Sequence, residues 1–143
     1  MFSAWSFVTV FSAICCAATP AGSVAFKTLD RGGQSNIETA GEMVVRTAAE
    51  WTALWKQHAP GRKPPAVDFK RSMVVGVFLG SRPTGGYTVD IAAIEPKGSE
   101  LVVTYREGRP DPNDMVTQVL TSPYHLVTTE RFAGPVRFAR GRP

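Results

Sequence analysis

The stretch SMVVGVFLGSRPTGGYTVDI, residues 72–91, places a continuous apolar run, a loop and an alternating run in direct succession. The first run is apolar on both of its alternating faces, which is typical of a strand that is covered on both sides. In the second run, Tyr87, Val89 and Ile91 share one face, as in a strand with one buried face. The stretch therefore predicts two strands, the first of them central in its sheet, joined by a loop over residues 81–86.

Further strands are predicted on both sides of this stretch, where short apolar or alternating runs end in glycine, proline and polar residues. They cover residues 26–32, 42–47, 100–107, 115–130 and 134–140. The run 115–130 is interrupted at Ser122 and Pro123, and because proline cannot donate to a ladder, we expect an edge, a bulge or a bend there. The short links between the runs predict mostly antiparallel pairing.

One helix is predicted between the second and third strands. Thr47 followed by Glu50 is a capping-box pattern, and Pro60 ends the segment. One face of this helix carries large side chains at i, i+3, i+4 and i+7, namely Trp51, Leu54, Trp55 and His58. We expect this face to pack on the sheet, with His58 in a core or capping role.

The pattern as a whole predicts an α+β fold: a mostly antiparallel curved sheet or partly open barrel of about seven short strands with one packed helix. Residues 26–143 are expected to form this single domain.

Residues 1–25 read as a signal peptide, which we expect to be cleaved. They contain no charged side chain, and their apolar centre is short for a membrane span and ends in small residues. Cleavage after Ala18, Ala21 or Ala25 fits equally well. An uncleaved membrane anchor and lipidation at Cys15 or Cys16 remain alternatives. Lipidation is disfavoured because Ile14 or Cys15 precedes the candidate cysteine, where a small residue is wanted. We expect a periplasmic or secreted domain that contacts membrane only through an uncleaved or lipidated N-terminus.

Composition argues against several functional classes. The net charge is +4, and the basic residues are dispersed, so we expect no nucleic-acid partner, which would require a basic stripe with interleaved aromatics. Removal of residues 1–25 would take away both cysteines and with them any disulfide or thiolate site.

No catalytic or metal-binding pattern is recognisable. His125 would need an aspartate at 90, 111 or 114 nearby to form a Ser-His-Asp triad, and nothing in the spacing requires it. The two histidines are too few and too far apart for a metal site, and the motif DPND, residues 111–114, lacks the spacing of a calcium loop and predicts a turn. We therefore expect no enzymatic activity, no metal and no cofactor.

The loop between the two strands is well specified. Pro83 fixes its own φ and favours an extended Arg82, and the pair Gly85 and Gly86 can take the positive φ values of a hairpin turn. Such rigidity lowers the entropic cost of binding, and arginine and tyrosine are common at binding hot spots. The simpler alternative is a plain hairpin in which Tyr87 is the first core residue of the next strand, and the sequence leaves Tyr87 open between core and contact.

A family resemblance supports the interpretation of this loop as a binding surface. SMVVGVFLGSRPTGGYTVDI, LVVTYRE and VTQVLTSPYHLV resemble the C-terminal domain of PrcB, a non-catalytic subunit of a bacterial surface protease complex. The similarity covers most of residues 69–127 and is strongest at 80–87 and 121–127. Residues 26–59 also resemble the helix-containing lead-in of stand-alone members. The resemblance implies a secreted or envelope protein that binds and stabilises a protease.

A weaker analogy concerns the RPTGGY motif, which resembles the loop that chagasin-like cysteine-protease inhibitors present between strands. It suggests a second hypothesis, direct inhibition of a cysteine protease, and a domain that binds a small molecule inside the sheet is a third. The leading prediction is a non-catalytic protein-binding domain with a protease as partner. Its predicted partner-binding residues are Arg82, Pro83, Thr84, Gly85, Gly86 and Tyr87, joined by Pro123, Tyr124 and His125 if the bent strand lies beside the loop.

Overall fold

The computed structural model of the protein describes residues 22–142. Most of the predicted signal peptide, with Cys15 and Cys16, lies outside the described residues. Within the described part of the chain, no helix is both long and apolar enough to cross a membrane.

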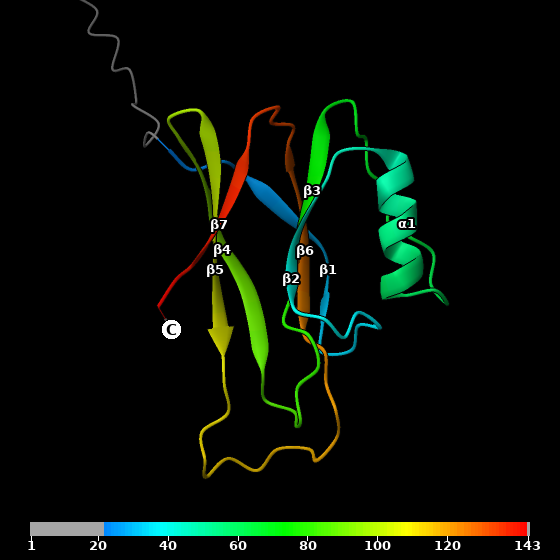
Figure 1. Ribbon diagram of the computed structural model, residues 1–143, viewed down its shortest axis with the longest axis vertical. Coiled ribbons are helices and arrows are strands. Elements are labelled where there is room, and N and C mark those ends of the chain that lie inside the picture. The colour runs from blue at the N-terminus through cyan, green and yellow to red at the C-terminus, as the bar shows by residue number, and fades with distance from the viewer. Residues whose placement is uncertain (1–21, 143) are drawn as a thin grey trace, which may run out of the picture.

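The predicted fold class is confirmed: seven strands and one helix form an α+β domain whose sheets are not closed (Figure 1). The elements in chain order are β1 (Phe26–Gly32), β2 (Gly41–Val45), α1 (Ala48–His58), β3 (Ser72–Phe78), β4 (Thr88–Lys97), β5 (Glu100–Gly108), β6 (Tyr124–Glu130) and β7 (Val136–Arg140).

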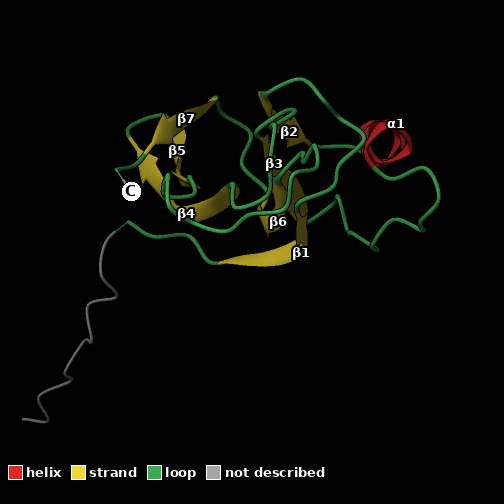
Figure 2. Ribbon diagram, turned by 90° about the horizontal axis from the view of Figure 1, so that it is seen from below, coloured by secondary structure: helices red, strands yellow, loops and turns green. Residues whose placement is uncertain are grey.

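The strands divide into two sheets. One is antiparallel with the order β1-β6-β3-β2, and the other has the order β4-β5-β7. Figure 2 shows the three layers in succession: the three-stranded sheet, the four-stranded sheet and α1. Strand β7 runs parallel to β5, whereas the other pairs are antiparallel, in line with the predicted majority.

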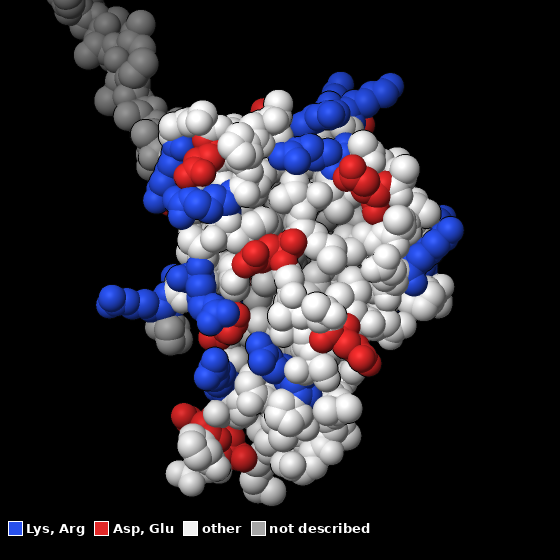
Figure 3. Space-filling view, viewed as in Figure 1, with Lys and Arg blue, Asp and Glu red and all other residues white. Residues whose placement is uncertain are grey.

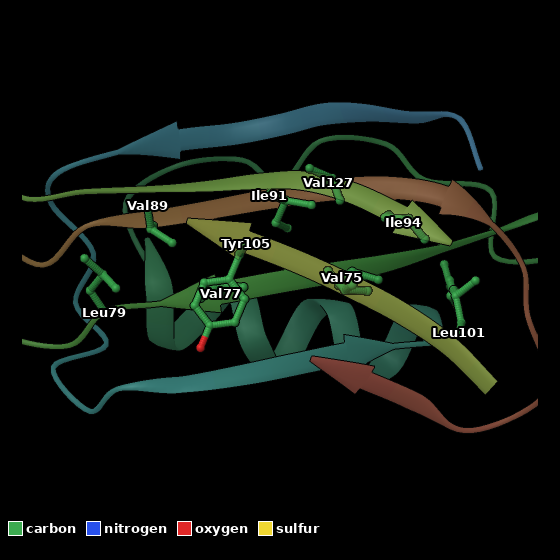
Figure 4. Packing of buried hydrophobic residues seen from close by; sticks show 11 residues of the cluster. Val75, Val77, Leu79, Val89, Ile91, Ile94, Leu101, Tyr105 and Val127 are labelled. Atoms are coloured by element: carbon green, nitrogen blue, oxygen red, sulfur yellow. The ribbon is translucent and has the colours of Figure 1, made fainter. Parts of the chain in front are cut away.

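Strand β3 is buried on both faces, as its composition predicts. Its side chains Met73, Val75 and Val77 enter the core between the two sheets, and Val74 and Phe78 enter a second core under α1. Figure 4 shows the first core, where Val75 and Val77 meet side chains of β4, β5 and β6. A strand that serves two cores has no face for polar residues, which explains the continuous apolar run.

The helix begins and ends as its sequence predicts. Thr47 is the N-cap, and its hydroxyl accepts a hydrogen bond from the backbone N–H of Glu50 at 3.2 Å. The four side chains of the predicted face are all buried. The two indole N–H groups donate to carbonyls of the following loop, Trp51 to Pro65 at 3.1 Å and Trp55 to Arg62 at 2.7 Å, so the helix also anchors that loop.

The predicted strand over residues 115–130 is wrong in its first half. Only Tyr124–Glu130 forms a strand, and residues 109–123 run as an irregular segment along one end of the molecule (Figure 1). Isolated bridges pair Thr121 with Arg82 and Ser122 with Gln34. Pro123, which has no N–H to donate, stands immediately before β6, so the proline marks where the regular ladder begins.

The hairpin interpretation of residues 81–86 is also wrong. Strands β3 and β4 belong to different sheets, so their connection passes from one sheet to the other. Because this loop does not close a hairpin, its backbone groups need hydrogen-bond partners outside β3 and β4. The segment 109–123 provides them.

Candidate protein-binding surface

The loop of residues 81–86 is held by the irregular segment beside it. The backbones of Arg82 and Thr121 exchange two hydrogen bonds, of 2.7 and 2.9 Å. Gly85 donates its N–H to the carbonyl of Thr117 at 2.9 Å, and the Thr121 hydroxyl donates to the carbonyl of Thr84 at 2.7 Å. Two segments nearly forty positions apart therefore form one pre-organised surface.

Glycine is required at two places in this contact. Gly86 has φ +86°, and a Cβ there would lie 2.8 Å from the Cβ of Pro110. Gly85 has no positive φ, but a Cβ on it would collide with the hydroxyl of Thr117. The glycine pair thus allows close packing between two loops, which is a different use from the predicted hairpin turn.

The neighbouring segment presents three exposed apolar side chains. Met115, Val119 and Leu120 have exposures of 102%, 54% and 71%, and they are the large hydrophobic residues that stand exposed among those described. We call these three residues the apolar tip. In Figure 3 the end of the molecule formed by residues 109–121 is mostly uncharged on the face shown, with acidic atoms to one side. Scattered single hydrophobic residues are ordinary, but three on one tethered segment form a candidate contact surface.

The predicted binding residues of the loop differ in accessibility. Pro83 and Gly86 are exposed, whereas Thr84 and Gly85 are half-buried against the segment 109–123. Arg82 is also half-buried, with its guanidinium 5.7 Å from the centre of the Tyr87 ring. Tyr87 itself is partly buried and packs against the core between the sheets.

The other three predicted contact residues lie inside the domain. Tyr124 and His125 are 4% and 3% exposed, and Pro123 is among the fully buried side chains. The bent strand does lie beside the loop, because Leu79 donates its N–H to the carbonyl of Pro123 at 2.9 Å. Because these side chains are buried, they cannot contact a partner directly. They lie beneath the candidate binding surface and support it.

Tyr124 and His125 point to opposite faces of β6, as the alternation of a strand predicts. Tyr124 enters the core under α1. His125 faces the other sheet, where its Nδ1 accepts the N–H of Ile91 at 2.9 Å and its Nε2 lies 2.9 Å from the hydroxyl of Thr28. Because Nδ1 is the acceptor, the ring is neutral and Nε2 carries the proton. Burial lowers the pKa of His125, and Arg31 lowers it further against the opposing effect of Asp90.

His58 lies buried at the end of α1, in a partly buried polar cluster that the sequence pattern did not predict. Its Nε2 donates to the carboxylate of Asp30 at 3.1 Å, and its Nδ1 accepts the hydroxyl of Ser35 at 2.8 Å. Arg62 donates to the same carboxylate at 2.7 Å. Burial raises the pKa of Asp30, but hydrogen bonds from Arg62, His58 and Tyr124 outweigh it and leave the pKa below its ordinary value.

The Ser35–His58–Asp30 arrangement has the hydrogen-bond order of a catalytic triad, but its serine is poorly placed for attack. Ser35 is 7% exposed, and its oxygen also accepts the N–H of Ile37 at 3.0 Å. Burial lowers the pKa of His58, which keeps the ring neutral although Asp30 opposes the shift. The cluster joins the β1–β2 connection to the end of the helix, and the core role expected for His58 matches this position.

The acidic motif at residues 111–114 closes a turn. The carboxylate of Asp114 accepts the N–H of Asp111 at 2.9 Å, and the N–H of Asp114 donates to the carbonyl of Asp111 at 3.0 Å. Within residues 22–142, no group of three or more His, Cys, Asp or Glu side chains is arranged to hold a metal ion.

Comparison with known proteins bears on the central part of the chain. The family model described as PrcB C-terminal matches residues 73–130, which run from β3 through β4, β5 and the segment 109–123 to the end of β6. The similarity of residues 26–59 to a lead-in lies outside this match and stays a prediction. No curated protein and no solved structure shows a significant match to the chain. The match confirms the resemblance seen in the motifs: residues 73–130 of this chain are similar to the PrcB C-terminal family.

Proposed function

We propose that this domain is a non-catalytic protein-binding module of a secreted or envelope protease complex, and that it binds and stabilises the protease through the apolar tip and the exposed part of the loop 81–86. The observation that carries the proposal is the apolar tip. Three solvent-exposed hydrophobic side chains sit on a segment that four hydrogen bonds tie to the loop. Burying such side chains is the main source of affinity at protein interfaces.

The surface is also tethered near residues 120–122. Ser122 donates its hydroxyl to the carbonyl of Ile37 at 2.7 Å, and Gln34 donates to the carbonyl of Leu120 at 3.3 Å. These bonds link the segment to the β1–β2 connection as well as to the loop. A pre-organised surface loses little conformational entropy on binding, which favours recognition of a folded partner.

The test is capture of the protease by purified domain from the envelope fraction, followed by measurement of affinity with the isolated protease. The double substitution Val119→Ser and Leu120→Ser should weaken binding by about tenfold or more, as expected when hot-spot side chains are removed. The matched control is Ala92→Ser, an exposed position on β4. Undiminished binding of the same protease by a folded double variant would exclude the apolar tip.

Stabilisation is a separate measurement. The purified protease should stay active for longer at the growth temperature of its organism when the domain is added. A ligand that binds only the folded state lowers the fraction of unfolded protease. The double variant should give less protection at equal concentration.

Direct inhibition of a cysteine protease receives less support. An inhibitory loop must enter a substrate cleft, whereas Thr84 and Gly85 are bonded to the segment 109–123 and half-buried. We expect a titration of papain with micromolar domain to leave its activity unchanged. A small-molecule site in the interior between the sheets is disfavoured because this core is packed with side chains that are 0–7% exposed.

The proposed location outside the cytoplasm rests on residues 1–25 and has its own test. If the segment is cleaved, we propose that cleavage follows Ala18 or Ala21 and not Ala25. The N–H of Val24 donates to the carbonyl of Ile94 at 2.7 Å, and the carbonyl of Ala25 accepts the Thr129 hydroxyl at 3.0 Å, so both residues belong to the fold. The N-terminal sequence of the exported protein would decide this.

A further inference from the structure

The two sheets meet differently on their two sides. On the side of β1 and β4, Val24 donates to Ile94, His125 accepts the N–H of Ile91, and Arg31 forms an ion pair with Asp90 at 2.6 Å. On the opposite side, β2 and β7 are the last strands of their sheets (Figures 1 and 2). The outer backbone groups of such edge strands are free to pair with another chain.

A cleft of about 240 Å³ lies on this open side. Its lining includes Gly41 at the start of β2 and the side chains of Glu42, Arg82, Tyr105, Glu107 and Arg140. Figure 3 looks onto this side and shows acidic and basic side chains gathered around its middle. Farther along, the guanidinium of Arg46 donates to the carbonyls of Phe132 and Gly134 at 3.3 and 2.9 Å, so the gap between the sheets is bridged there. The cleft is therefore short.

The charges around the cleft are paired except at one position. Arg140 pairs with Glu107 at 2.9 Å, and Glu42 accepts the hydroxyl of Tyr105 at 2.9 Å, a side chain that Figure 4 shows reaching across the core. Arg82 forms no ion pair among the described residues, and its Nε is buried without a hydrogen-bond acceptor. A buried guanidinium N–H without an acceptor is unfavourable, and a carboxylate is the acceptor that fits it best.

We propose that this cleft binds an extended peptide segment that pairs with the free edge of β2 and places a carboxylate against Arg82. Addition of a strand to an exposed edge uses backbone hydrogen bonds for affinity and a side-chain contact for specificity. The site deepens the proposed function, because such a segment would belong to the protein partner. Arg82 lies on the loop that carries the binding surface, so one partner can reach both places.

The experiment measures peptide binding by the purified domain alone, by fluorescence anisotropy. The probe is a labelled, N-acetylated and C-amidated hexapeptide, Val-Thr-Val-Glu-Val-Thr. We expect saturable binding with Kd below about 1 mM. A glutamine in place of the glutamate should weaken binding about tenfold, because the charge-assisted bond is lost. A peptide with proline at both threonine positions should not bind, because it lacks the N–H groups needed for pairing.

Two protein variants locate the site. Arg82→Gln should abolish the preference for glutamate over glutamine; it should fold, because the loop is held through the backbone of Arg82. Arg106→Gln, at an exposed position next to the cleft residue Tyr105, is the matched control and should keep the preference. In amide NMR spectra, the glutamate peptide should shift signals of residues 40–42 and 105–107.

Absence of saturable binding at about 1 mM, or equal affinity for the glutamate and glutamine peptides, would overturn the proposal. The double variant of the apolar tip should bind the peptide normally. If that variant loses protease capture and the unaltered domain binds no peptide, the proposed function stands and peptide binding in the cleft is excluded. Peptide binding by the domain, together with protease capture that does not depend on the apolar tip, would leave the peptide-binding cleft standing and exclude the proposed function of the tip.

Discussion

His125 shows what one buried, neutral side chain does in this fold. Its ring bridges the sheets by accepting the N–H of Ile91 and approaching the hydroxyl of Thr28. We expect His125→Leu to lower the unfolding free energy at pH 7 by about 2 kcal/mol, since the N–H of Ile91 loses its acceptor. His125→Asn, which can keep an acceptor near the Nδ1 position, should lose less. Urea unfolding of the three proteins would measure the difference, and equal losses would contradict the assigned acceptor.

The pH dependence follows from the same geometry. The pKa values of His58 and His125 are both lowered in the folded state, mainly by burial. The unfolded chain therefore takes up protons first, and stability that is fully present above about pH 6.5 declines as pH falls toward the folded pKa values. We expect the urea midpoint to decrease between pH 7 and 5, and this decrease to be smaller in His125→Asn. A midpoint that is constant over this range would contradict neutral, buried histidines.

Gly86 is constrained by backbone conformation and by space. We expect Gly86→Ala to lower the unfolding free energy by about 1–2 kcal/mol, because a side chain at φ +86° is strained and its Cβ would press on Pro110. Gly33→Ala is the matched control, since a Cβ there meets nothing within 4 Å. Thermal unfolding of both variants provides the comparison, and equal melting temperatures would contradict the close contact.

At the scale of the element, α1 depends on its N-cap. Thr47→Ala removes the acceptor for the N–H of Glu50 and should cost about 1 kcal/mol of unfolding free energy. Thr52→Ala, an exposed position within the helix, should cost less or be slightly stabilising, because alanine has the higher helix propensity. Chemical denaturation of the two variants measures the cap directly, and a larger loss at Thr52 would contradict the capping assignment.

At the scale of the whole molecule, the N-terminal boundary of the fold can be tested by truncation. A chain beginning at Phe26 loses the bond from Val24 to Ile94 and the carbonyl that accepts the Thr129 hydroxyl. We expect it to unfold with about 2 kcal/mol less free energy than a chain beginning at Gly22. Identical denaturation curves would show that residues 22–25 contribute nothing to the fold.

The elements could be predicted because they depend on local patterns. The two-faced apolar run of β3, the capping box before α1 and the alternation from Tyr87 to Ile91 reflect interactions within a few residues or with any apolar neighbour. The prediction of a strand over residues 115–121 was wrong because a short apolar run resembles a strand, yet the apolar side chains of Met115, Val119 and Leu120 are exposed to solvent. Pattern alone does not reveal which face meets a core.

Local sequence patterns were enough to predict the number and type of the elements and the buried face of the helix. The three-dimensional structure was needed to show that the strands form two sheets, that the loop 81–86 crosses between them and packs closely at its glycine pair, and that Tyr124 and His125 lie inside. The cluster around Asp30 and the cleft beside Arg82 likewise combine residues far apart in the chain. Local propensity acts over a few residues, whereas sheet partition and burial depend on long-range contacts that no short pattern encodes.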